Sequence, residues 1–245
     1  MQDRYVGDIG DFGKLGLLRS LIGETGLRLG VAWYRVPDES HNNDGRYVDY
    51  LEPANADAYR PCDPELYDAL AGIIAAGNRS VSMIEQAPIL PIDTVYHGQP
   101  LSFAGVSPRQ RPELRRQWLA TMVDSLAACE IVFADPDNGI ECSTGCCDLK
   151  GPKFVYWGDL DDLMRPARSL VIYHHLGRRG SHPSQIEAIK NQIASKLHVP
   201  VEAMWFRRGS GRVYLIAMAP SHQEAFSTRL SRMAASPWSA HFTRC

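Results

Sequence analysis

Several features that identify a class of protein at once are missing from this sequence. Its 245 residues include no run of about 18 apolar residues, so a membrane-spanning helix is not expected. The segment Met1–Asp8 is polar and acidic, and it lacks the basic start and apolar core of a secretory signal. There is no internal repeat and no low-complexity tract. The composition, 44% hydrophobic and 22% charged, is typical of a globular protein, which we expect in the cytoplasm.

Cysteine spacing and net charge argue against two further classes. The cluster Cys142-Ser-Thr-Gly-Cys-Cys147 lacks the paired Cys-x-x-Cys spacing of a structural zinc site. Free thiols are expected for all six cysteines, with a redox pair or a metal clip as the alternative. The formal net charge of −2 gives no global basic field that would attract nucleic acid. The arginines are clustered, however, and local basic patches are compatible with a phosphate-bearing partner: Arg109, Arg111, Arg115 and Arg116; Arg178 and Arg179; Arg207, Arg208 and Arg212.

The apolar pattern predicts helices and strands that alternate along the chain. Residues 80–87 fit either type, and we expect Asp11 to cap the first helix. Ser221 is expected to cap the last helix in a capping box with Glu224. The predicted helices cover 11–24, 64–76, 112–128, 160–164, 184–197 and 221–234, and the predicted strands cover 27–36, 94–97, 130–134, 153–157, 169–173, 199–206 and 213–219.

Alternating helices and strands indicate parallel crossovers and a sheet that is covered on both faces. The last two strands are joined by Arg207-Arg-Gly-Ser-Gly-Arg212, whose two glycines suit an antiparallel hairpin. We therefore predict the α/β class, with a doubly wound, mostly parallel sheet and a C-terminal antiparallel hairpin. Residues 1–245 are expected to form a single domain, with an insertion or irregular region at about 46–110.

The most informative segment is Ile131-Val-Phe-Ala-Asp-Pro-Asp-Asn-Gly-Ile140. A buried strand that stops in this way places two carboxylates and an amide at the carboxyl edge of a sheet, where ligands bind in open α/β folds. Pro136 also restricts Asp135 to extended geometry. Asp135, Asp137 and Asn138 are therefore candidate site residues. The carboxylates would accept hydrogen bonds from a substrate or hold a hard cation such as Mg²⁺. The structural alternative is a turn in which an aspartate caps the next segment.

Two acidic segments lie earlier in the chain. Gly7-Asp-Ile-Gly-Asp-Phe-Gly-Lys14 places Asp8, Asp11 and Lys14 at the start of a helix, where the N-terminus favours an anion, although the Walker spacing is absent. The loop Pro37-Asp-Glu-Ser-His-Asn-Asn-Asp-Gly45 follows the first long strand. Its polar side chains are candidates for ligand or metal binding, and the alternative is a solvated loop.

A fourth polar segment, His174-His-Leu-Gly-Arg-Arg-Gly-Ser-His182, follows the strand over 169–173. Because side chains alternate along a strand, at most one of His174 and His175 faces a cleft at that edge. A histidine there is a candidate general base, since its ordinary pKa is about 6.5. Arg178 is a candidate partner for a phosphate.

The late hairpin after a series of helices and strands resembles the Rossmann-like fold of S-adenosylmethionine-dependent methyltransferases, whose seven-stranded sheet has an antiparallel last strand. Asp135-Pro-Asp-Asn-Gly139 is similar to the Asp-Pro-Pro-Tyr motif of the amino-methylating enzymes. The strand ending in Tyr173-His-His-Leu-Gly-Arg178 is similar to the fifth strand of bacterial ribosomal-RNA adenine-N6 methyltransferases. Those enzymes also begin with a helical segment that carries an Asp and a Lys, which correspond here to Asp11 and Lys14.

The resemblance implies a methyl donor, S-adenosylmethionine, and Asp135 as the acceptor of a hydrogen bond from the target amine. It implies cofactor contacts from the N-terminal segment and from the loop after the first long strand: Asp8, Asp11, Lys14, Asn43 and Asp44. Two motif elements differ. The loop after the first strand holds one glycine in place of a Gly-x-Gly turn, and Asp137 and Asn138 replace the second proline and the aromatic that would stack on a flipped base.

Three functions remain open at this point. The leading hypothesis is a methyltransferase acting on a nucleic acid or nucleotide, with Asp135, Asp137, Asn138, His174 and Arg178 in the catalytic site. The second is a metal-dependent phosphohydrolase or nuclease on the same scaffold, in which carboxylates hold Mg²⁺ and activate water. The third is a non-catalytic module that binds nucleic acid. Both enzymatic hypotheses require the four polar segments to converge around one cavity.

Overall fold

A seven-stranded sheet forms the centre of the protein, in the order β2-β1-β3-β6-β8-β7-β9. The computed structural model describes residues 1–39 and 45–245. Strands β2, β1, β3 and β6 run parallel to one another, whereas β8 pairs antiparallel with both β6 and β7, and β9 pairs antiparallel with β7. This confirms the predicted mostly parallel sheet with a C-terminal antiparallel hairpin. The strands are β1 (Leu29–Trp33), β2 (Val95–His97), β3 (Ile131–Asp135), β6 (Ser169–His175), β7 (Val201–Phe206), β8 (Arg212–Ala217) and β9 (Phe242–Arg244), and a separate pair is formed by β4 (Gly139–Ile140) and β5 (Phe154–Val155).

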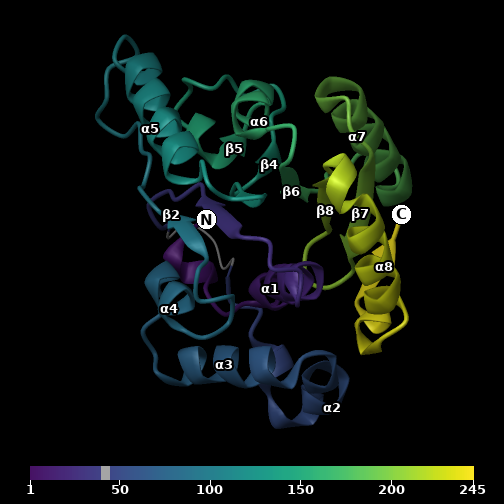
Figure 1. Ribbon diagram of the computed structural model, residues 1–245. Coiled ribbons are helices and arrows are strands. Elements are labelled where there is room, and N and C mark those ends of the chain that lie inside the picture. The colour runs from purple at the N-terminus through teal and green to yellow at the C-terminus, as the bar shows by residue number, and fades with distance from the viewer. Residues whose placement is uncertain (40–44) are drawn as a thin grey trace.

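Helices cover both faces of the sheet, as expected for a doubly wound fold (Figure 1). One face packs against α1, α3, α4 and α8, and the other packs against α5, α6 and α7. Within residues 1–39 and 45–245, no helix combines the length and the apolar character needed to cross a membrane. The helices are α1 (Ile9–Ile22), α2 (Ala56–Tyr59), α3 (Pro64–Ala75), α4 (Val81–Gln86), α5 (Arg111–Ser125), α6 (Trp157–Leu163), α7 (His182–Leu197) and α8 (Gln223–Ala234), with short 3-10 turns at Asp3–Tyr5, Asp49–Leu51, Pro53–Asn55, Arg60–Cys62, Gly151–Lys153, Pro220–His222 and Pro237–Ala240.

The alternation of side chains decides which polar residues meet at the edge of the sheet. On β3, Ile131 and Phe133 pack on the α1 face, whereas Val132 and Ala134 pack on the α5 face. Asp135 therefore belongs to the α1 face, because side chains two residues apart point the same way. The same reasoning applies to the paired strands β6 and β8, where Tyr173 lies opposite Tyr214 and His175 lies opposite Arg212.

The caps of two helices differ from the predictions. Asp8 caps α1 instead of Asp11: its Oδ1 accepts hydrogen bonds from the backbone N–H groups of Gly10 (2.8 Å) and Asp11 (3.1 Å). The helix therefore begins two residues earlier than predicted. The predicted capping box at Ser221 is also wrong, because a 3-10 turn occupies Pro220–His222 and α8 begins at Gln223 without a side-chain cap.

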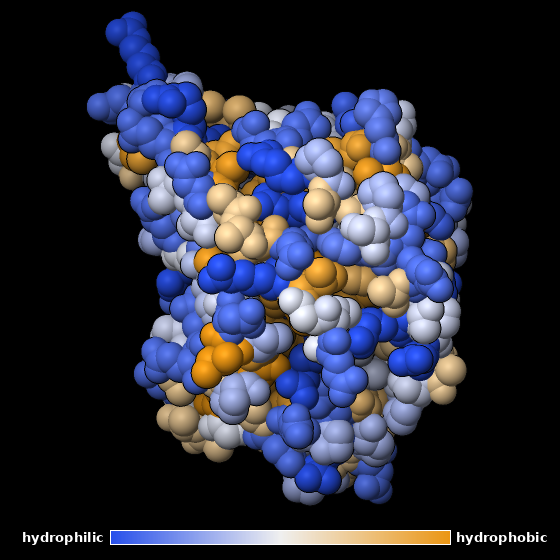
Figure 2. Space-filling view, viewed as in Figure 1, coloured by the Kyte–Doolittle hydropathy of each residue, from blue (hydrophilic) through white to orange (hydrophobic). Residues whose placement is uncertain are grey.

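The middle third of the chain, 46–110, contains the short helices α2, α3 and α4 and the edge strand β2. Residues 80–87, which fit either type, contain helix α4. The side chains of α3 and α4 add to the core on the α1 face. On the face seen in Figure 2, hydrophilic residues make up most of the surface and apolar residues form separate patches.

Candidate functional site

A cavity of about 400 Å³ opens at the carboxyl edge of the sheet, on the α1 face. Its walls come from the N-terminal segment and the start of α1, from the end of the loop after β1, from the end of β3, and from the end of β6 with the start of β8. The segments that the sequence predicts around a common cavity thus meet there. Seven predicted site residues line the cavity: Asp8, Asp11, Lys14, Asp135, Asp137, Asn138 and Arg178.

Lys14 lies at the centre of the acidic wall. Its Nζ atom is 2.7 Å from Asp135 Oδ2 and 3.0 Å from Asp11 Oδ1, and all three side chains are buried. Burial raises the pKa of Asp11 to about 6, although the Lys14 charge opposes this shift. Burial alone would lower the pKa of Lys14, but the two carboxylates hold it above its ordinary value. Lys14 is therefore a permanent cation that links α1 to the end of β3.

Asp137 is held by groups of the protein itself. Gln2 Nε2 donates a hydrogen bond of 2.8 Å to its carboxylate, and Lys153 Nζ lies 3.2 Å away while also contacting Glu39 Oε2 at 2.6 Å. Burial alone would raise the pKa of Asp137, but the positive charges of the Met1 amino group and Lys153 lower it. This aspartate fixes the loop after β3, and its neighbour Asn138 donates its backbone N–H to Lys153 O at 2.9 Å.

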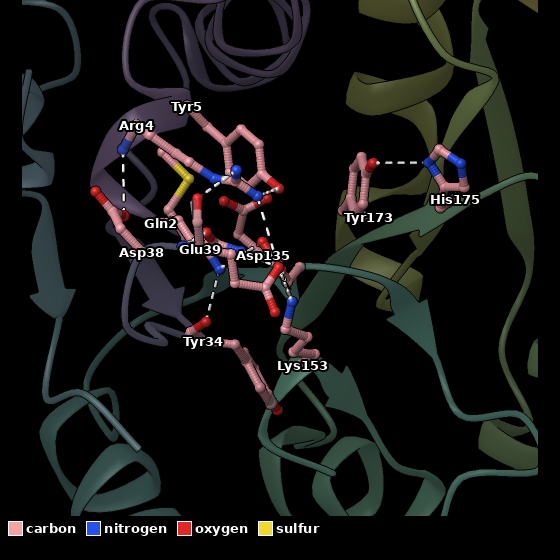
Figure 3. A network of polar contacts seen from close by, with 12 residues as sticks. Gln2, Arg4, Tyr5, Tyr34, Asp38, Glu39, Asp135, Lys153, Tyr173 and His175 are labelled. Atoms are coloured by element: carbon pink, nitrogen blue, oxygen red, sulfur yellow. Dashed lines mark hydrogen bonds and ion pairs between the residues drawn. The ribbon is translucent and has the colours of Figure 1, made fainter. Parts of the chain in front are cut away.

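Tyr173 and His175 belong to the opposite wall of the cavity, together with Arg212 at the start of β8. The Tyr173 hydroxyl lies 3.4 Å from His175 Nδ1, and Figure 3 shows this pair across from the side chains around Asp135. The cavity thus has one wall of carboxylates that surround a lysine and another wall of aromatic and cationic groups.

The structure places His174 outside the lining of this cavity. Its Nδ1 accepts a hydrogen bond of 3.1 Å from the backbone N–H of Ile140. The two histidines point to opposite faces of β6, as the alternation predicts, and His175 is the one that faces the cavity. His174 therefore supports the segment after Asp135 instead of reaching a ligand.

Two other predicted residues, Asn43 and Asp44, lie outside the described residues. Sequence reasoning did not select Tyr5, Tyr173, Lys153 or Arg212 as site residues, although all four line the cavity or hold its wall. The sequence could have indicated Tyr173, because it lies two residues before His175 on the same strand and therefore points to the same face. No sequence pattern indicates Lys153, since it is distant in sequence from Asp137.

The position of Lys14 bears on the metal-dependent hypothesis. Its ammonium group lies between Asp11 and Asp135, so it already supplies the positive charge that a cation would bring to these carboxylates. In the part of the chain that the structure describes, no group of three or more His, Cys, Asp or Glu side chains is arranged to hold a metal ion. The described residues therefore give the metal-dependent alternative no set of ligands.

Comparisons with known proteins add little to this geometry. No protein-family model matches the chain, and no curated protein matches it. Among solved structures, the crystal structure of human methyltransferase-like protein 13 in complex with SAH is similar over 93% of this chain and 91% of that chain, with 12% sequence identity and a TM-score of 0.36. A likeness this weak carries no weight for the chemistry of the cavity, which rests on the residues described above.

A His174→Asn substitution is expected to flatten the pH dependence of stability between pH 4 and 6.5. Burial, with a smaller contribution from His175, lowers the pKa of His174 to about 4. Between pH 4 and 6.5 the unfolded chain therefore binds a proton at this residue, whereas the folded chain does not. The contribution of neutral His174 to the unfolding free energy is fully present above pH 6.5 and is lost as the pH falls toward 4. After allowance for partial exposure, the loss is about 2 kcal/mol.

Asparagine offers an acceptor near the position of Nδ1 and does not titrate. Urea unfolding of the wild type, His174→Asn and a His175→Asn control at pH 4.5 and 7 measures the effect. The prediction is wrong if His174→Asn and the wild type lose the same free energy on acidification.

Proposed function

We propose that this chain is an S-adenosylmethionine-dependent methyltransferase that acts on an amino group of a nucleic acid or nucleotide. The observation that supports this most is the setting of Asp135. Its carboxylate ends β3 at the carboxyl edge of the sheet and lines the cavity, and Lys14 holds its Oδ2 atom at 2.7 Å. Its Oδ1 atom forms no hydrogen bond within residues 1–39 and 45–245, so this oxygen is available to a ligand.

The proposed reaction requires positioning more than a strong base. S-adenosylmethionine, when bound, supplies an electrophilic methyl group. Asp135 accepts a hydrogen bond from the substrate amine through Oδ1 and thereby turns the nitrogen lone pair toward that methyl group. Lys14 keeps the carboxylate in the required orientation, because it is fixed on both sides by buried acids. The proton released from the amine passes to Asp135 or to solvent.

The cavity fits a cofactor of this kind in size and charge. Its volume of about 400 Å³ is within the range of small-molecule sites. Asp8, just before α1, caps the helix through Oδ1, and its Oδ2 atom is on offer to the ammonium group of the cofactor. The contact with the cofactor on this side would therefore come from a residue predicted in the N-terminal segment.

Tyr173 supplies the aromatic ring that the segment after β3 lacks. Strands β3 and β6 are parallel neighbours, with Ala134 opposite Ile172. Tyr173 therefore lies beside Asp135 on the same face of the sheet, and it lines the same cavity. A half-buried ring in this position can stack on a base whose amine reaches Asp135. An aromatic from the next strand would then replace the one expected in the motif itself.

Isothermal titration with S-adenosylmethionine and with SAH tests the proposal directly. We expect both to bind with dissociation constants in the micromolar range, on the order of 1–100 μM, and we expect transfer of a labelled methyl group to RNA, DNA or a nucleotide. A matched variant, Lys14→Met, should lose transfer. Absence of heat with both ligands at about 100 μM protein would overturn the proposal.

A further inference from the structure

Arg212 is a buried cation for which the described residues provide no carboxylate partner. Its side chain lines the cavity, and the residue is 7% exposed. Its Nη2 donates a hydrogen bond of 2.8 Å to Ser210 Oγ, while its Nε has no hydrogen-bond partner within residues 1–39 and 45–245. None of the ion pairs formed within the described ranges includes Arg212. Buried charges in proteins are normally paired, so this guanidinium is a position for an anionic ligand.

The chain is built to hold this guanidinium in place. Arg212 begins β8 and is paired with His175 on one side and Phe206 on the other, which fixes its backbone. Its Nη1 atom occupies the space over Gly10, where a Cβ atom would overlap it. Residue 10 is therefore required to be small if the guanidinium is to reach the cavity, and the start of α1 and the start of β8 together define the position.

The surrounding charges keep Arg212 protonated without pairing it. Burial alone would lower its pKa, but Tyr173, Asp8, Tyr214 and Asp11 raise it above the ordinary value. Neither Asp8 nor Asp11 forms an ion pair with it, because Asp8 caps α1 and Asp11 contacts Lys14. Arg178 is exposed at the same wall and adds a second positive charge.

We propose that Arg212, assisted by Ser210 and Arg178, binds a terminal phosphate of the substrate, which is a nucleoside monophosphate or the phosphorylated end of an oligonucleotide. This inference rests on the proposed function and names its substrate more closely. The planar guanidinium matches two oxygens of a phosphate at once. Arg212 is buried in a cavity of about 400 Å³. A phosphate monoester, which carries one ester substituent, therefore fits better than an internal diester, because both chains attached to a diester would have to extend from the phosphate out of the cavity.

The site lies on the β6–β8 side of the cavity, where Arg212 packs over Gly10 at the start of α1, whereas Asp135 ends β3, which lies on the other side of β6 in the sheet. The base would then lie between Tyr173 and Asp135, with its phosphate directed toward Arg212.

Titrations with AMP and with adenosine, without a methyl donor, test the assignment. We expect the wild type to bind AMP at least about tenfold more tightly than adenosine, and Arg212→Gln to lose this difference while its affinity for adenosine is unchanged. Gly10→Ala, which displaces the guanidinium but keeps its charge, should show the same loss. Arg207→Gln is the matched control, since Arg207 in the same hairpin bonds backbone carbonyls of Ser239 and Ala240 outside the cavity.

A second pair of probes, an RNA oligonucleotide with and without a 5′-phosphate, separates a mononucleotide from a nucleic-acid end. A preference for the phosphorylated form that Arg212→Gln removes supports the oligonucleotide source, and a preference confined to AMP supports the mononucleotide. Equal affinities of the wild type for AMP and adenosine would refute the phosphate site. So would an Arg212→Gln variant that binds SAH more weakly but keeps the AMP preference. An intact AMP preference without any binding of S-adenosylmethionine would refute the methyltransferase proposal alone.

Discussion

A Lys14→Met variant is expected to lose about 3–5 kcal/mol of unfolding free energy at pH 7.5. Lys14 lies between the buried carboxylates of Asp11 and Asp135, and methionine removes the charge while keeping an apolar stem of similar length. Two acids would then remain buried with no cation between them. Removal of one partner from a buried ion cluster is much more costly than removal of an exposed charge. Urea unfolding followed by circular dichroism measures the loss.

The pH dependence of this loss provides its control. A carboxyl group whose pKa is raised in the folded state binds a proton there more tightly than in the unfolded state, so its stabilising contribution is present at low pH and is lost as the pH rises. The pKa of Asp11 is already raised from 3.8 to about 6 beside Lys14, and it rises further without that charge. Lys14→Met should therefore recover stability between pH 7.5 and pH 5.

The matched variant is Lys190→Met, because Lys190 on α7 donates a hydrogen bond to the backbone carbonyl of Cys245 and lies outside the lining of the cavity. It should change the unfolding free energy by about 1 kcal/mol or less at both pH values. Equal losses in the two lysine variants, or a Lys14→Met loss that is independent of pH, would show that the buried ion cluster contributes no more than an ordinary surface lysine.

The sequence predicts most of the sheet because its central strands are buried on both faces. Strands such as Ile131–Asp135 and Ser169–His175 are nearly continuous apolar runs, which are easily located between polar turns. The edge strand Phe242–Arg244, which pairs with β7, has three residues, and two of them are polar. A strand this short has no apolar run by which the sequence could reveal it. The pair Gly139–Ile140 and Phe154–Val155 is equally short.

The same burial explains why the sequence could not choose between His174 and His175. A strand with one polar face shows which side chains point inward, but Leu170, Val171 and Ile172 are all apolar, and they pack on both faces. The alternation is therefore present in the structure and invisible in the sequence. The face to which each histidine points becomes known only from the structure, in which Val171 packs on the α1 face. Tyr173 and His175 point to the same face as Val171 and line the cavity.

The four polar segments could be placed at one edge because the carboxyl ends of parallel strands coincide. This rule was sufficient to predict that Asp135, Asp137, Asn138 and Arg178 lie around one cavity. Arg212 could not be found in this way. Its position depends on the antiparallel insertion of β8 beside β6 and on the absence of a side chain at Gly10, which is distant in sequence.

An Asp135→Asn variant is expected to lower the rate of methyl transfer by roughly 10²–10³-fold while it retains the fold and the affinity for S-adenosylmethionine. Asparagine is nearly isosteric, and its carbonyl oxygen can still accept the hydrogen bond that Lys14 now donates to Oδ2. The amide nitrogen then takes the position of Oδ1. It presents hydrogen atoms to a substrate amine that itself donates, so the hydrogen bond that orients the nitrogen is lost.

Single-turnover measurements with saturating donor isolate this step, and the melting temperature checks the fold. Glu141→Gln is the matched control, since Glu141 lies in the segment after β3 but outside the lining of the cavity, and it accepts a hydrogen bond from the backbone N–H of Trp157. It should transfer methyl groups at the wild-type rate. Because Lys14 remains paired with Asp11 at 3.0 Å, Asp135→Asn should be far more stable than Lys14→Met. If Asp135→Asn is stable, binds S-adenosylmethionine and transfers at the rate of Glu141→Gln, Asp135 is not the acceptor of the amine hydrogen bond, and its carboxylate serves only to hold Lys14.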